Sequence, residues 1–505
     1  MTTESNAGPS AIPVLMARLV VAWIVYLCVA RAFSPGFLEL SAPLHSDVYR
    51  YYEIASKPFE WQLLLSPRPL MLLALRLLDV DSFGVFYVLL LAAPVALPVF
   101  MLAALERVAQ LRVGWLATVC YVALCYVLPS FYELAPLDFG GACAGIFACL
   151  AAIALVTATR WRRVAAYALL TWLSLECKPA YAFVLCVLPL LTSAGMRPGE
   201  RWRAAMVAFV VCLMVFAKDH WIGSSFVGVG AESGSSYQLL GGPVIMLEAA
   251  KFYIQRLFSP VTWVVLAALA AWVLRQRSWR PLAALALLGA AAILPMLLIP
   301  NHRFVMYTWF ASSILLLVLP IASTRILAMP RNVALWSLAL IAVTVLALWS
   351  ESRFLSIHRG WYEYNQRMNA NIMRSLHVLS TQLTPGEKVL VSGQFGPYVP
   401  YKNDALVAAI LPSGVEWTVV APPSEDPLIA MSPNTRRYTR ITEIDGASFD
   451  RHVAYDAEGN IRKISSPDPR LGHGGDTPER RALLFCASSG KPDAQERAAC
   501  LATVH

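Results

Sequence analysis

Residues 44–70, LHSDVYRYYEIASKPFEWQLLLSPRPL, combine carboxylates, cations and aromatic rings. Aromatic rings can stack on the C–H faces of a sugar, and carboxylates accept hydrogen bonds from its hydroxyl groups. The sequence therefore predicts a sugar or acceptor site here, and Asp47, about fourteen residues after the first apolar run, is its most notable carboxylate. The residues expected to contact the sugar or the acceptor are Tyr49, Tyr51, Tyr52 and Glu53. The alternative is an aromatic belt at a membrane surface with solvated charges.

A second acidic pair, Glu133 and Asp138, lies in the short turn FYELAPLDFGG between two apolar runs. A short turn holds both carboxylates near the end of any helix bundle that the runs form. Asp138 could instead cap the helix that follows it, since Asp is favoured at the N-cap and by the positive end of the helix dipole. Both interpretations of Asp138 stay open.

Basic side chains lie next to the ends of three other apolar runs. They are Lys178 in SLECKPAYAF, Lys218 with His220 in AKDHW, and His302 with Arg303 in PNHRFVMY. Cations at such places can bind a phosphate or pyrophosphate at the level of the lipid headgroups. The alternative is that each side chain snorkels to ordinary phospholipids.

The elements that must position these residues are apolar helices. The chain has 505 residues, of which 58% are hydrophobic and 14% charged, and its mean hydropathy is +0.57. Soluble proteins carry about 25% charged residues, so soluble, disordered and nucleic-acid-binding classes fit poorly. Successive apolar runs predict a polytopic α-helical membrane protein with about 11 transmembrane helices.

The charges predict the orientation of the chain. The part from Ser350 onward carries 17 basic and 17 acidic residues, which leaves 24 basic against 15 acidic residues before it. Arginine-rich loops alternate with acidic loops, and basic loops stay in the cytoplasm. We therefore expect a cytoplasmic N-terminus, and the acidic loops outside.

The same topology predicts two domains. Residues 1–349 form the transmembrane domain, with a first outside loop at 34–82 and a mobile, Gly- and Ser-rich outside loop at 220–258. Residues 350–505 form an outside α/β domain, with a helix at 358–383 and strands at 387–393 and 415–422.

Cys486 and Cys500 are the only cysteines of the predicted outside domain. An oxidising compartment favours a disulfide between them, and the alternative is two free thiols. No metal site is predicted. His45 and Asp47 could share a divalent cation, but two ligands are thin evidence for one, and we expect no cofactor.

Several elements together resemble bacterial C-type integral-membrane glycosyltransferases, the superfamily of the aminoarabinose transferases and protein mannosyltransferases. They are an Asp soon after the first helix (HSDVYRYYE), a downstream Arg-Pro (SPRPL), a short acidic turn, a KPxxxF hairpin (KPAYAF) and an HRF element before a late helix. The resemblance covers about the first 350 residues. The paired acids of the better-known branches are absent, because this chain has Ser46 before Asp47.

The resemblance implies a GT-C fold and transfer of a sugar from a polyprenyl-phosphate-linked donor to a glycolipid, polysaccharide or protein of the cell envelope. It implies Asp47 as general base, with Glu133 or Asp138 as a second acid. The basic residues that it implies at the departing phosphate are Lys178, His302, Arg303 and Arg68. The location implied is the bacterial inner membrane, with chemistry on the periplasmic face.

Three other functions compete with this interpretation. A polysaccharide polymerase or ligase would use late arginine-rich outside loops. A transporter of lipid-linked sugars would carry polar residues in mid-membrane and related halves. A scaffold with an outside binding module would not need Asp47. Nucleic acid is not expected as a partner.

Overall fold

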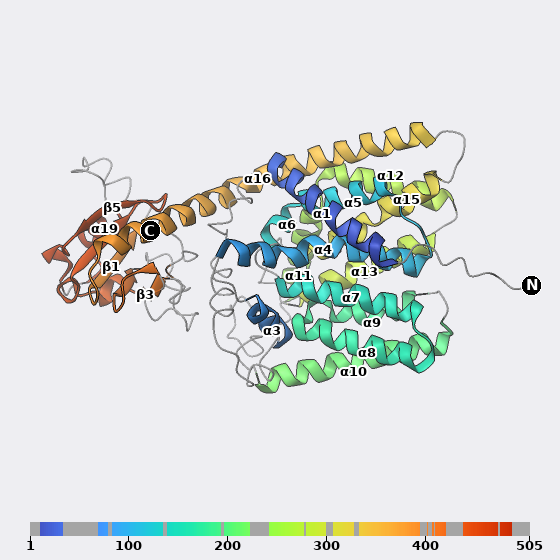
Figure 1. The fold of residues 1–505 in the computed structure, drawn as a ribbon, viewed down its shortest axis with the longest axis horizontal. Coiled ribbons are helices and arrows are strands. Elements are labelled where there is room, and N and C mark those ends of the chain that lie inside the picture. Colours follow the sequence, from blue (N-terminus) through green and yellow to red (C-terminus); the bar gives the residue numbers. More distant parts are fainter. Residues whose placement is uncertain are drawn as a thin grey trace, which may run out of the picture. The chain divides into compact units, whose positions relative to one another are not determined.

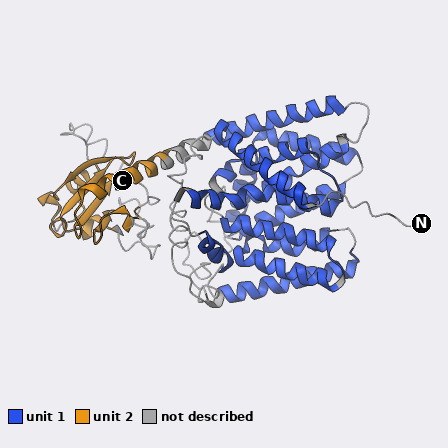
Figure 2. Cartoon of the chain, in the orientation of Figure 1, with its two compact units in different colours: residues 1–38, 58–79, 85–358 blue, residues 39–57, 80–84, 359–505 orange. Residues whose placement is uncertain are grey.

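The computed structural model divides the chain into two compact units, residues 1–38, 58–79 and 85–358 in the first and residues 39–57, 80–84 and 359–505 in the second (Figure 2). Each unit is described by itself. The residues that the structure describes are 11–33, 69–78, 83–134, 139–192, 196–222, 242–276, 279–298, 307–327, 333–393, 401, 407–408, 410–420, 438–472 and 475–486.

The first unit is a bundle of α-helices (Figure 1). Its helices are α1 (Ala11–Phe33), α3 (Pro69–Leu77), α4 (Phe83–Ala109), α5 (Trp115–Val127), α6 (Pro129–Leu134), α7 (Phe139–Thr157), α8 (Arg160–Cys177), α9 (Ala182–Leu191), α10 (Pro198–Ile222), α11 (Pro243–Leu257), α12 (Pro260–Arg275), α13 (Trp279–Leu297), α14 (Thr308–Leu316), α15 (Val318–Leu327) and the first part of α16 (Val333–Gln382). The short helix α3 lies within the segment 34–82 that the sequence analysis predicts as the first outside loop.

Six helices among the described residues are long and apolar enough to cross a membrane, or seven if the bent pair α11 and α12 forms one span. The prediction of a polytopic helical membrane protein is therefore confirmed. The predicted count of about 11 helices stays a prediction. Two further apolar segments, Trp115–Val127 and Pro179–Leu191, form shorter helices. Each falls short of the about 20 residues that a full crossing needs.

An aromatic cluster holds the centre of the bundle together. The Tyr26 ring of α1 lies 5.8 Å from the rings of both Tyr126 and Phe131. The Phe131 ring also lies 5.5 Å from that of Trp309 in α14. Two of these rings also bond to the backbone, since Tyr126 Oη donates to the Val95 carbonyl and Trp309 Nε1 to that of Cys125. The cluster thereby fixes α6, the helix that contains Glu133.

Helices α3, α7 and α8 meet at a glycine. A Cβ atom on Gly140, in the first turn of α7, would lie 2.5 Å from Met71 Sδ of α3 and 3.1 Å from the Cys177 carbonyl of α8. A side chain at this position would have to displace Met71 and crowd the Cys177 carbonyl, and glycine avoids both. The short helix α3 is thus held against the end of α8, directly before Lys178.

The prediction of a loop over residues 220–258 is wrong for the second half of this segment. Residues 243–257 form α11, which buries Ala249, Tyr253 and Leu257. Pro243 at the first helical position favours a helix start. Glu248 and Lys251 interrupt the apolar run, so that the segment does not look like a membrane span in the sequence. Residues 223–241 lie outside the described part of the chain.

The second unit contains a five-stranded sheet in the order β3-β2-β1-β4-β5. Its strands are β1 (Lys388–Gly393), β2 (Glu416–Val420), β3 (Tyr438–Thr439), β4 (Arg451–Tyr455) and β5 (Ile461–Ser465). The first four strands are parallel, and β5 is antiparallel to β4. β1 and β2 coincide with the two runs that the sequence analysis predicted as strands.

Side chains of successive residues cover opposite faces of this sheet. Val389 and Val391 of β1 pack with Ile372 and Leu376 of α16. Leu390 between them packs on the other face with a cluster that includes α19 (Pro478–Phe485). The predicted domain boundary at 349/350 falls inside α16, which is one continuous helix from residue 333 to 382. The two units divide at residues 358 and 359.

His452 is a buried titratable group of this sheet. Its Nε2 lies 2.8 Å from Ser392 Oγ, and the residue is 3% exposed. Burial lowers the pKa of His452 to about 4, because a charged imidazolium loses its hydration there. In the unfolded chain a histidine has a pKa of about 6.5. Between pH values of about 4 and about 6.5, His452 is therefore protonated in the unfolded chain and neutral in the folded unit.

We therefore expect the second unit to lose about 2 kcal/mol of its free energy of unfolding between about pH 7 and about pH 5. Pulse proteolysis of the full-length protein in urea measures this. His452→Asn should flatten the pH dependence, whereas His377→Asn, on the exposed face of α16, should leave it intact. An unchanged slope in His452→Asn would contradict the assignment.

Candidate functional site

The end of α8 gathers the ionisable side chains that form the candidate site. Glu176 and Lys178 bracket Cys177, the last residue of α8. Lys178 has extended backbone dihedral angles and precedes Pro179. Proline disfavours the α-helical conformation of the residue that precedes it, so α8 ends before Lys178. Lys178 therefore lies at the point where the apolar run stops.

Lys178 is buried although it carries a charge. Its residue is 9% exposed, and Nζ lies 5.1 Å from the centre of the Tyr307 ring, just before α14. Its backbone N–H donates to the Ser174 carbonyl. An ammonium over an aromatic face is stabilised by the ring quadrupole, by about 2 kcal/mol when it is desolvated. The ring thus stabilises the buried cation.

An ion pair joins the same end of α8 to α10. Lys218 Nζ contacts Glu176 Oε2, and it lies 3.5 Å from Asp219 Oδ1. The side chains of Glu176 and Asp219 are 3% and 10% exposed, and that of Lys218 is 23% exposed. Two carboxylates facing one ammonium leave a formal charge of −1.

The predicted site residues fall into three groups. Lys178 is described with its side chain, as above. Glu133 lies in α6, and its side chain is outside the described residues. The remaining predicted catalytic, phosphate-binding and sugar-binding residues all lie outside the described residues: Asp47, Tyr49, Tyr51, Tyr52, Glu53, Arg68, Asp138, His302 and Arg303. The roles of these residues stay predictions.

Three contributors were not singled out from the sequence. Glu176 and Asp219 neutralise Lys218, and Tyr307 supports Lys178. All three lie within quoted motifs, and an acidic residue at the edge of an apolar run is itself a signal. The pairing itself joins residues 42 positions apart, which no spacing rule predicts.

Cys486 at the end of α19 is disulfide-bonded. The other described cysteines are free thiols. Its predicted partner, Cys500, lies outside the described residues, so the pairing of these two cysteines stays a prediction.

Metal ligands do not gather in the described part of the chain. No group of three or more His, Cys, Asp or Glu residues comes close enough there to hold an ion. The predicted first outside loop is outside the described residues, so participation of a cation at Asp47 is still to be tested.

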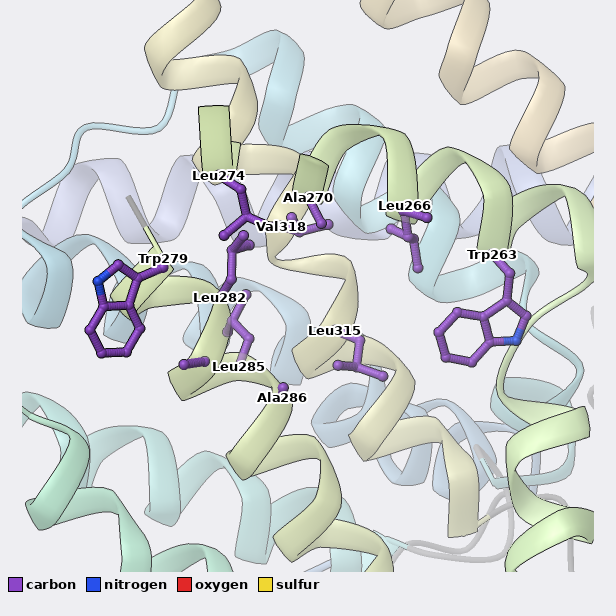
Figure 3. Close-up of a pocket in the computed structure, with 12 residues that line it drawn as sticks. Trp263, Leu266, Ala270, Leu274, Trp279, Leu282, Leu285, Ala286, Leu315 and Val318 are labelled. Atoms are coloured by element: carbon purple, nitrogen blue, oxygen red, sulfur yellow. The ribbon is translucent and has the colours of Figure 1, made fainter. Parts of the chain in front are cut away.

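A cavity of about 460 Å³ lies between α12 and α13, with Leu315 of α14 and Val318 of α15 at its wall (Figure 3). Trp263 and Trp279 are at its two ends in this view. All its lining residues are apolar. Such a wall suits hydrocarbon and offers no group for acid–base or phosphate chemistry, so the cavity is not the candidate site.

The fold and site thus define a polytopic helical membrane protein that holds a buried lysine at one end of its bundle. No family model matches the chain, and no curated protein matches its sequence. Among solved structures, the chain is similar to that of ArnT from Cupriavidus metallidurans bound to undecaprenyl phosphate. The identity is 12%, the TM-score is 0.48, and the match covers 88% of this chain and 94% of the ArnT chain. A likeness of this degree assigns neither a family nor a function.

The Glu176–Lys218 pair predicts a large stability effect. Lys218→Met should lower the free energy of unfolding by about 3 kcal/mol, because Glu176 would be left buried and uncompensated. The thermal midpoint in detergent measures the loss. Lys251→Met, on the exposed face of α11, is the matched control and should be neutral. Equal midpoints for the two variants would contradict a structural role for the pair.

Proposed function

We propose that the chain is an integral-membrane glycosyltransferase of the C type. It transfers a sugar from a polyprenyl-phosphate-linked donor to an acceptor of the bacterial cell envelope, on the periplasmic face of the inner membrane. The observation that carries the proposal is Lys178, a buried ammonium supported by Tyr307 at one end of an apolar bundle. A lipid phosphate is the anion that reaches such a place, because its hydrocarbon tail stays within the bilayer.

The burial of a cation supports an anionic ligand. Lys178 is 9% exposed and its Nζ lies over the Tyr307 ring, whereas Lys218 already faces two carboxylates. In the proposal, an incoming phosphate oxygen accepts a charge-assisted hydrogen bond from Lys178. The KPAYAF motif that contains Lys178 is one of the elements that resemble the C-type family.

In the proposed reaction Asp47 accepts the proton of the acceptor hydroxyl. The hydroxyl oxygen attacks the anomeric carbon, and the bond from this carbon to the lipid phosphate oxygen breaks with inversion. Lys178, together with His302, Arg303 and Arg68, stabilises the negative charge that builds on the departing phosphate. Glu133 or Asp138 orients the acceptor or the donor.

The proposal predicts which substitutions abolish transfer. In a deletion strain, Asp47→Asn should leave less than about one-hundredth of the wild-type product, since a positioned general base contributes about 10²–10⁴-fold. Lys178→Met should lose about tenfold or more, and Lys178→Arg should retain part of the activity, because the charge persists. Mass spectrometry of surface glycolipids and glycoproteins at matched expression measures the missing sugar.

Arg203→Met is the matched control for Lys178→Met. Arg203 is exposed near the start of α10, about 22 Å along the helix from Lys218. This variant should make the wild-type glycan profile. If Asp47→Asn and Lys178→Met also restore the full profile, sugar transfer at this site is wrong, and the transporter and scaffold interpretations move ahead.

A further inference from the structure

The break between α11 and α12 is held from both sides by buried side chains. The two helix axes differ by 82°, and the residues at the turn, Leu257, Phe258 and Ser259, are at most 4% exposed. Ser312 Oγ of α14 donates to the Leu257 carbonyl at 3.0 Å. The Ser259 N–H donates to Glu351 Oε1 of α16 at 2.7 Å. The last carbonyl of α11 and the N–H that precedes α12 are therefore both paired.

Glu351 completes a helix cap that the local sequence leaves half made. Ser259 is the N-cap of α12, and its Oγ accepts from the N–H of Thr262, three residues later. In a complete capping box the residue at that third position is Glu or Gln and bonds back to the N-cap N–H. Thr262 cannot do this, and Glu351 takes its place from 92 positions away. Ser350 Oγ adds a bond of 2.7 Å to Ser259 Oγ.

The carboxyl group of this cap is buried in an apolar helix, where an ionisable group costs free energy. Glu351 is 0% exposed and lies in the apolar span Val333–Ser356. Its second oxygen, Oε2, accepts no hydrogen bond from the described residues. Buried ionisable groups in membrane spans are costly and tend to serve a function. The positive end of the α12 dipole offsets part of the cost of burying the Glu351 carboxylate. What the carboxylate provides in return is the fixed turn between α11 and α12.

That geometry determines the surroundings of Lys178. Beyond the break, α11 packs its buried Ala249 and Tyr253 against Met296 of α13, and Ala180 and Tyr307 belong to the same cluster. Ala180 is two residues after Lys178, and Tyr307 supports its ammonium. A change in the angle between α11 and α12 would displace both. No other described contact fixes the N–H of Ser259.

We propose that Glu351 is a positioning residue for the Lys178 site. Its carboxyl group locks the break between α11 and α12, and α11 in turn holds Tyr307 and Ala180 where they direct the Lys178 ammonium. The inference rests on the proposed function in one respect, that Lys178 binds a lipid phosphate. The lock itself stands on contacts within the first unit alone.

Hydrogen exchange of the full-length protein in detergent tests the lock without any assay of activity. Glu351→Ala should increase the exchange of amides in residues 243–263 by about tenfold, as expected when a buried cap is lost. Glu351→Gln keeps an acceptor oxygen and should stay within about twofold of wild type. Exchange in α7 should not change.

A pair of serines provides milder, matched variants in case Glu351→Ala fails to fold. Ser350→Ala removes the bond to Ser259 and should raise the exchange of the same residues severalfold. Ser352→Ala, two residues further along α16, removes only a bond to the Trp349 carbonyl of its own helix. Equal exchange in the two serine variants, or wild-type exchange in Glu351→Ala, would overturn the lock.

A double-mutant cycle then tests the link to Lys178, with undecaprenyl phosphate in micelles as the probe. Glu351→Ala should weaken its binding about tenfold in the wild-type background and less than about twofold in Lys178→Met. A merely destabilising change would cost the same in both backgrounds, and that result would overturn the positioning role. If wild type does not bind the probe, the proposed donor fails, while the exchange experiment still decides the lock.

Discussion

A charged side chain inside an apolar bundle loses its hydration and must gain a partner that compensates for the loss. The first unit satisfies this constraint in three ways. Lys218 faces two carboxylates, Lys178 lies over a ring, and Glu351 caps a helix. Lys218 already faces anionic groups, so the proposed phosphate site is assigned to Lys178 and not to Lys218.

The same constraint explains how distant segments come to define one site. Buried charges restrain the helices that contain them, because separating a buried pair leaves an ion uncompensated. Glu176 and Lys218 hold α8 to α10, and Glu351 holds α16 to the start of α12. The close contact at Gly140 adds α3 and α7 to the end of α8. The candidate site is therefore built by the ends of helices.

The second unit shows how burial acts on a side chain outside the membrane spans. His452 is held neutral within a mostly parallel sheet, with its ring against Ser392. Tyr401 and Tyr455 form a second buried polar pair, with their hydroxyl oxygens 2.6 Å apart. Both pairs are satisfied internally, as buried polar groups must be. They therefore contribute to the order of the sheet.

The sequence by itself determined the class of protein, the end of α8 and the positions of β1 and β2, because hydrophobic runs, the Lys178-Pro179 step and alternating valines act locally. It also singled out Lys178. Helix α11 was missed, since Glu248 and Lys251 lower its hydropathy. The partners Tyr307, Lys218 and Glu351 were decided only by the tertiary structure. Each pairing joins residues far apart in the chain, and which buried charge meets which partner depends on how the helices pack.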